Sequence, residues 1–124
     1  MLRQFVVVKT EFQATHNWPT CNIEEVEFLK NEHRHRIFVT VKVETTGDRE
    51  VEFFVLKGVV DQLIDDAYGF DKLKRMGSSS METISHRLLS ELRQLGYNAV
   101  EVSAFEDDEV GSVVMEDDVD AGHK

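Results

Sequence analysis

Three histidines lie at the ends of two β-like segments, where their imidazoles could share one ligand. His33 and His35 are two residues apart at the start of His33–Thr45, a run rich in Val that is typical of a strand. Successive side chains of a strand alternate between faces, so both rings should point the same way, about 6.5–7 Å apart along the chain. His16 ends an earlier β-like run in phase with Ala14. If the two runs pair antiparallel, the three imidazoles converge at one end of a sheet.

Three neutral imidazoles are a recognised set of protein ligands for zinc. They leave a fourth position open, which is typical of catalytic rather than structural zinc sites. An H-x-H pair at a strand edge also occurs on ordinary solvated surfaces, so a metal-free edge is the alternative. We therefore predict one zinc ion held by His16, His33 and His35.

The segments around these histidines resemble a known enzyme family. Residues 12–16 read F-Q-A-T-H, and this F-x-A-x-H, followed by an H-x-H that opens a second strand, resembles the 6-pyruvoyltetrahydropterin synthase and 6-carboxytetrahydropterin synthase family. Residues 52–57, E-F-F-V-L-K, are similar to the D-F-x-x-L-K that opens the first helix of that family. Residues 79–82, S-S-M-E, stand in the place of its P-T-S-E, which opens the second helix.

A further segment resembles the part of the family that binds the pterin ring. Ala104-Phe105-Glu106, with Gly111 five residues later, is similar to E-T-x-x-S-G, whose glutamate grips the ring in the family. The resemblance therefore implies that Glu106 binds substrate while the histidines hold zinc, as two separate duties. A carboxylate can accept two parallel hydrogen bonds from an N–H and an NH₂ group.

The position of Glu106 in its strand is consistent with such a role. It falls in phase with Val100, Val102 and Ala104, so it ends a face that we expect to be buried. A carboxylate there must be paired or must bind something. The alternative is a solvated charge at a strand end, beside Asp107.

The catalytic residues of the family are not matched in this chain. Family members carry a Cys a few residues before the H-x-H, whereas Cys21 lies twelve residues before His33. A loop carboxylate is the other candidate for the base, and Glu27, Glu25 and Glu32 all stay open. The Asp-His pair that follows the first helix in the family is also missing, since residues 64–68 read I-D-D-A-Y.

Composition restricts the kinds of partner. The chain has 124 residues, 31% of them charged, and a formal net charge of −10 at pH 7, which argues against binding nucleic acid or an anionic membrane surface. No apolar run approaches the roughly 20 residues of a membrane span, and no signal-peptide pattern is seen. The single cysteine excludes an intrachain disulfide, so we expect a protein of the reducing cytoplasm.

The periodicity of the apolar residues predicts an α+β domain over residues 1–115 and an acidic mobile tail over residues 116–124. A two-residue period indicates strands, a spacing of three to four residues indicates helices, and an S-x-x-E capping box at Ser79 starts the second helix, which Gly96 ends. Residues 17–31 are predicted to be a long loop, residues 50–54 a short β-like piece, and residues 68–78 a polar linker. The predicted order β-β-α-α-β-β comprises strands at residues 3–15 and 33–45, helices at 55–67 and 79–95, and strands at 99–106 and 110–115.

This order is that of the tunnelling fold, in which the named family folds. We expect a four-stranded antiparallel sheet with two helices on one face, and sheets from several subunits joining into an oligomeric barrel, a trimer or a hexamer. The first strand is apolar on both faces around Phe5–Val8, which indicates that a partner covers its second face.

The resemblance implies a zinc-dependent, pterin-forming lyase acting on 7,8-dihydroneopterin triphosphate. Two alternatives stay open because Cys21 and the missing Asp-His pair depart from the family. One is a diverged member that binds zinc and a pterin-like ligand without the usual reaction. The other is a non-catalytic oligomeric interaction protein whose sheet serves assembly only.

Overall fold

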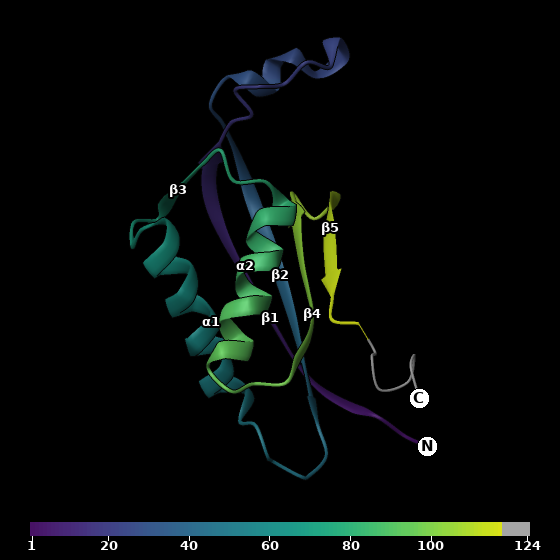
Figure 1. Cartoon of the computed structure of the whole chain (residues 1–124). Helices are drawn as coiled ribbons and strands as arrows, with labels where there is room; N and C mark the ends of the chain where they lie inside the picture. The colour runs from purple at the N-terminus through teal and green to yellow at the C-terminus, as the bar shows by residue number, and fades with distance from the viewer. Residues whose placement is uncertain (118–124) are drawn as a thin grey trace.

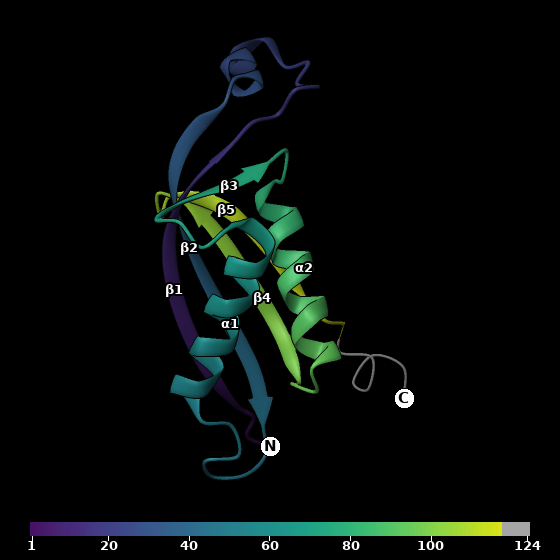
Figure 2. The same cartoon turned by 90° about the vertical axis from the view of Figure 1, so that its left-hand side faces the viewer.

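A computed structural model describes residues 1–117, and its centre is a five-stranded mixed sheet with two helices on one face (Figures 1 and 2). The strand order across the sheet is β3-β1-β2-β4-β5. In chain order the elements are β1 (Gln4–His16), the 3₁₀ helix η1 (Glu24–Lys30), β2 (His33–Thr45), α1 (Phe53–Tyr68), β3 (Leu73–Gly77), α2 (Met81–Gln94), β4 (Ala99–Glu106) and β5 (Val110–Met115). Within residues 1–117, neither helix has the length and hydropathy that a transmembrane helix needs.

The core lies between the sheet and the two helices. From β2, Ile37, Val39, Val41 and Val43 are at most 1% exposed, and Leu56 and Val60 of α1 are fully buried against them. The α+β class, the antiparallel pairing of β1 with β2, and the placement of both helices on one face are confirmed. The opposite face carries no element of the described chain, and Phe5 and Val7 of β1 remain 38% and 44% exposed there.

The sheet contains one strand more than predicted, so the four-stranded antiparallel sheet is corrected to a five-stranded mixed one. Within the predicted linker, β3 pairs parallel with β1. The sequence did not indicate this strand, because polar and charged residues such as Lys74 are typical of a solvated linker. In the structure its side chain is buried beside Met76, and its Nζ bonds Asp65 Oδ1 and Gly69 O at 2.6 and 2.7 Å.

The helix starts also differ from the predicted ones. The helix α1 begins at Phe53 with Glu52 as its N-cap, so residues 50–54 form no strand. The cap of α2 is Ser80, whose Oγ accepts from Thr83 N at 3.0 Å, and the predicted capping box at Ser79 is wrong by one residue. Gly96 ends α2 with φ of 100°, as predicted.

Two further points concern the buried residues of β4 and the C-terminal end of the chain. Ala99, and not Val100, is buried with Val102 and Ala104, because the pairing of β2 with β4 shifts register between Lys42 and Val43. The predicted acidic tail, residues 116–124, lies outside the described residues from residue 118 onward.

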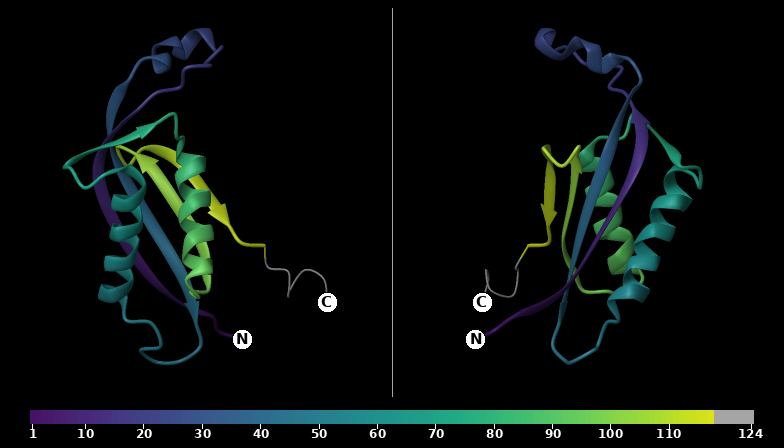
Figure 3. Two further views of the ribbon diagram at one scale, coloured as in Figure 1. Left: turned by 60° about the vertical axis from the view of Figure 1, so that its left-hand side comes forward. Right: turned by 180° about the vertical axis from the view of Figure 1, so that it is seen from behind.

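Residues 17–32 form an arm that projects beyond the end of the sheet (Figures 1 and 3). The arm was predicted as a loop, and it contains η1, which has no buried residue. Two backbone hydrogen bonds close its base: Asn17 N donates to Gly77 O, and Trp18 N donates to Leu29 O. The arm therefore connects β1 to β2 next to the end of the sheet where the histidines lie.

Candidate metal centre

The three predicted histidines meet at the end of β1 and β2 from which the arm projects. Antiparallel pairing puts His16 opposite His33 and Ala14 opposite His35, so all three rings stand on one face of the sheet. Their ring centroids are 4.6 Å (His16–His33), 5.6 Å (His16–His35) and 5.0 Å (His33–His35) apart. The predicted convergence of three imidazoles is confirmed, and its binding of zinc stays a prediction.

Each ring is held through its Nδ1 atom by an acceptor. His16 Nδ1 lies 3.0 Å from Ser79 O, His33 Nδ1 2.8 Å from Asn31 O, and His35 Nδ1 2.7 Å from Asp107 Oδ2. A carbonyl or carboxylate oxygen only accepts, so the proton of each neutral ring must be on Nδ1. Each Nε2 then carries a free lone pair, which is the arrangement that second-shell acceptors produce around metal-binding histidines.

Glu106 completes the cluster from β4. Its Oε2 lies 2.7 Å from His16 Nε2 and its Oε1 lies 3.9 Å from His35 Nε2. One donor atom from each of the four residues lies within 4.8 Å of every other. The Nε2 atoms of His16 and His33 are buried and have no well-aligned hydrogen-bond partner among residues 1–117. Because three imidazoles and a carboxylate place donor atoms this close together, the donor set fits a zinc ion.

The charges of the cluster shift its titration. The hydrogen bond to Glu106 raises the pKa of His16 above its ordinary value; the carbonyl of Ser79 also raises it, against a lowering by partial burial. The same hydrogen bond, with the charges of the three rings, lowers the pKa of the Glu106 carboxyl, while burial opposes this. In the metal-free protein a proton on His16 therefore pairs with an ionised Glu106.

Asp107 joins the cluster through the turn between β4 and β5. Its Oδ2 accepts from His35 Nδ1, and its Oδ1 accepts from Arg36 N at 3.1 Å. These two bonds lower the pKa of its carboxyl, the histidine contributing most. Asp107 and Asp108 have φ of 55° and 57°, which L-residues other than Asn and Asp seldom adopt. The turn thus places the carboxylate of Asp107 next to Nδ1 of His35.

A pocket of about 700 Å³ opens beside the cluster. His16, His33 and Glu106 form part of its wall. The arm contributes Trp18 and Leu29, while further lining comes from the start of α2 and from β5. The volume is in the range of small-molecule sites, about 300–1,000 Å³.

The structure does not bring the two predicted catalytic residues into this pocket. Cys21 is buried inside the arm, with its Sγ 3.9 Å from Ile23 O and 3.7 Å from Val26 O. Glu27 is exposed on η1 and lies 3.4 Å from Lys30 Nζ. Neither residue lines the pocket. Their roles as base stay predictions, and each needs a movement of the arm.

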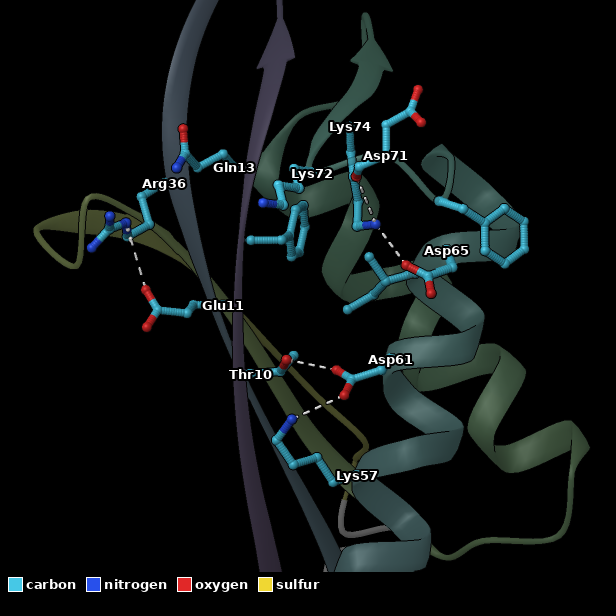
Figure 4. Close-up of a pocket in the computed structure, with 13 residues that line it drawn as sticks. Thr10, Glu11, Gln13, Arg36, Lys57, Asp61, Asp65, Asp71, Lys72 and Lys74 are labelled. Atoms are coloured by element: carbon cyan, nitrogen blue, oxygen red, sulfur yellow. Dashed lines mark hydrogen bonds and ion pairs between the residues drawn. The ribbon is translucent and has the colours of Figure 1, made fainter.

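A second pocket, of about 620 Å³, lies between β1, α1 and β3 (Figure 4). Two ion pairs lie in its wall: Lys57 Nζ bonds Asp61 Oδ2 at 2.9 Å, and Lys74 bonds Asp65. Thr10 donates to Asp61 at 2.6 Å. Asp65 stands where the family has its Asp-His pair, and here it serves to hold a buried lysine.

The sequence did not point to the residues that hold the rings by Nδ1. Two of these acceptors are backbone carbonyls, of Ser79 and Asn31, and any residue type supplies a carbonyl. Asp107 appeared in the sequence only as the neighbour of Glu106 at a strand end. Its place next to Glu106 and after a strand was the one available signal that it lies near the histidines.

Comparison with known proteins supports the same fold. The structure matches that of the uncharacterized protein WS1659 from Wolinella succinogenes, with a TM-score of 0.71 and 13% identity, over 94% of this chain and 100% of that chain. It also matches 6-pyruvoyl tetrahydropterin synthase from Caenorhabditis elegans, with a TM-score of 0.69 and 15% identity, over 94% of this chain and 100% of that one. No family model and no curated protein sequence matches the chain. The chain therefore shares the fold that the sequence resemblance implied, at low sequence identity.

Proposed function

We propose that this protein is a zinc-dependent, pterin-forming lyase of the 6-pyruvoyl- or 6-carboxytetrahydropterin synthase type, acting on 7,8-dihydroneopterin triphosphate. The observation that carries the proposal is the set of three imidazoles, each with Nδ1 held by an acceptor, whose donor atoms lie within 4.8 Å of one another and of that of Glu106. The fold shared with a 6-pyruvoyl tetrahydropterin synthase supports it.

His16, His33 and His35 would hold the metal. Bound zinc supplies a Lewis acid that polarises oxygen atoms and lowers the pKa of a hydroxyl group. Glu106, in the wall of the same pocket, accepts hydrogen bonds from the N–H edge of the pterin ring. The ring and its side chain are thereby oriented in a pocket of sufficient volume.

A base must remove a carbon-bound proton before triphosphate or a two-carbon fragment leaves. Cys21 or Glu27 would take this role, and both belong to the arm. The arm makes part of the pocket through Trp18 and Leu29, so its closure over a substrate would move both residues relative to the ring.

We further propose that the active form is a homo-oligomer, a trimer or a hexamer, whose sheets join into a barrel. The face of the sheet opposite the helices supports this, because Phe5, Val7, Val113 and Met115 are all exposed there or on the adjoining edge strand. Exposed apolar residues gathered on one face are typical of protein interfaces.

One observation favours a second function, in which zinc and a pterin-like ligand bind without this reaction. The pocket beside His16 and His33 has no cysteine among its lining residues, and its acidic residues are Glu82 and Glu106. A third candidate, a metal-free interaction protein, would leave the aligned Nε2 atoms without a role.

The test is a product assay on 7,8-dihydroneopterin triphosphate, run together with metal analysis of the same sample. The lyase is expected to release a tetrahydropterin product from zinc-loaded protein, and His33→Ala to abolish both zinc and product. Zinc and pterin binding without product supports the second function. Absence of zinc and of pterin binding would leave only the interaction protein.

A further inference from the structure

Glu106 lies closer to the histidines than a residue that only grips a ring needs to be. Its Oε2 is 2.7 Å from His16 Nε2, and its side chain is only 20% exposed. Its donor atoms lie within 4.8 Å of those of all three histidines. Zinc bonds to nitrogen and oxygen are about 2.0–2.2 Å long, so donor atoms this close together could share one ion once Oε2 of Glu106 and Nε2 of His16 move apart.

The contact between Glu106 and His16 requires a cation. Nδ1 of His16 holds its proton toward Ser79 O, so Nε2 of the neutral ring offers only a lone pair. A carboxylate oxygen also offers only lone pairs, and at 2.7 Å the two would repel. Either a second proton on the His16 ring or a metal ion would remove this repulsion. A metal ion would in addition take up the lone pair of His33 Nε2, which has no well-aligned hydrogen-bond partner among residues 1–117.

The backbone of Glu106 is fixed by the hairpin rather than by a loose loop. Glu106 pairs with Ile37 of β2 and with Val110 of β5. Gly111 allows the two strands of the hairpin to approach closely, since a Cβ there would lie 2.1 Å from Ala104 O. The carboxylate is therefore presented to the histidines by a rigid element, as metal ligands usually are.

We propose that Glu106 is the fourth protein ligand of the metal in the resting protein. With three imidazoles and one carboxylate, the protein itself would supply four ligands to a bound zinc ion, and an oxygen donor of a substrate would have to take the place of the carboxylate. The displaced Glu106 is then free to accept hydrogen bonds from the pterin ring. This inference rests on the proposed zinc site. The sequence suggested that the histidines bind zinc and that Glu106 binds only the ring, whereas here Glu106 binds the metal first and the ring afterwards.

X-ray absorption at the zinc edge of the resting protein tests the inference without any substitution. The expected first shell is three imidazole nitrogens and one carboxylate oxygen. In protein loaded with cobalt, the visible spectrum should be that of a four-coordinate ion, and adding neopterin should change it. The measurement on the parent is decisive even if a substitution disturbs the hairpin.

Two variants give a matched comparison. Glu106→Gln should weaken zinc binding at least about tenfold in a chelator competition, because even partners outside the ligand set typically change metal affinity about 10–100-fold. Glu109→Gln removes the same charge from the same hairpin, where Glu109 is exposed, and should leave zinc affinity unchanged. Equal loss in both variants would show a general charge effect and overturn the inference.

The outcomes separate this inference from the proposed function. A parent that binds zinc with three nitrogens and a water, and a Glu106→Gln variant with unchanged affinity, would overturn the inference and leave the zinc site in place. A parent that binds no zinc would overturn the proposed function itself.

Discussion

Replacing Asp107 by Asn tests whether the outer partner of His35 tunes the metal site. Asn has nearly the same shape and adopts positive φ readily, so the turn at φ of 55° should be retained. The carboxylate accepts from two donors, His35 Nδ1 and Arg36 N, at 2.7 and 3.1 Å. An amide has one oxygen, so one donor would face an NH₂ group, and the negative charge beside the imidazole would be lost.

Removal of such a partner typically lowers metal affinity about 10–100-fold. We expect a loss in this range for Asp107→Asn, measured by competition for zinc with a chromophoric chelator at fixed pH and ionic strength. The thermal midpoint of the metal-free protein should stay near that of the parent. Asp108→Asn is the matched control. Asp108 has φ of 57° in the same turn, and within residues 1–117 it is not part of the histidine cluster. Unchanged affinity in Asp107→Asn, or an equal loss in Asp108→Asn, would refute the reasoning.

Three further predictions concern the ligands, the titration and the assembly. His33→Ala should lose zinc while its circular dichroism spectrum stays that of the parent. His86→Ala is the control, because His86 lies on the exposed side of α2, and this variant should keep zinc. Retention of zinc in His33→Ala would contradict the proposed ligand set. In metal-free protein the pair of His16 with Glu106 stabilises the fold fully between about pH 4.5 and pH 6.5. This stabilisation is lost as pH rises through the raised pKa of His16, and also as pH falls through the lowered pKa of Glu106. The melting temperature of the parent should therefore exceed that of Glu106→Gln by more at pH 6 than at pH 9, and an equal difference at both would count against the pair. Light scattering should give three or six times 14.3 kDa, and a 14.3 kDa monomer at micromolar concentration and low salt would refute the assembly.

The convergence of the histidines could be predicted because it depends only on the two-residue period of a strand and on the pairing of two neighbouring strands. The two-residue period of a strand fixes which face His33 and His35 share, and antiparallel pairing of neighbouring strands then brings in His16. The same two-residue period in β4 predicted that Glu106 ends the buried face of that strand. The stop of α2 at Gly96 was also predictable, because a left-handed position after a helix favours glycine.

The missed features depend on contacts between distant parts of the chain. The strand β3 contains Lys74, and only the tertiary structure shows that Asp65 and a carbonyl satisfy its buried ammonium. Moving the cap of α2 by one residue, from Ser79 to Ser80, leaves the Ser79 carbonyl free to accept from His16. Neither pairing leaves a signal in residue type or spacing, which is why the sequence alone could not supply them.

We propose that three histidines of the sheet bind one zinc ion in each chain. Elemental analysis of protein purified without added metal tests it most directly, followed by removal of metal with a chelator and dialysis against zinc. We predict close to one zinc per chain before chelation and the same content after dialysis. Protein with almost no zinc, in which dialysis restores none, would contradict the account.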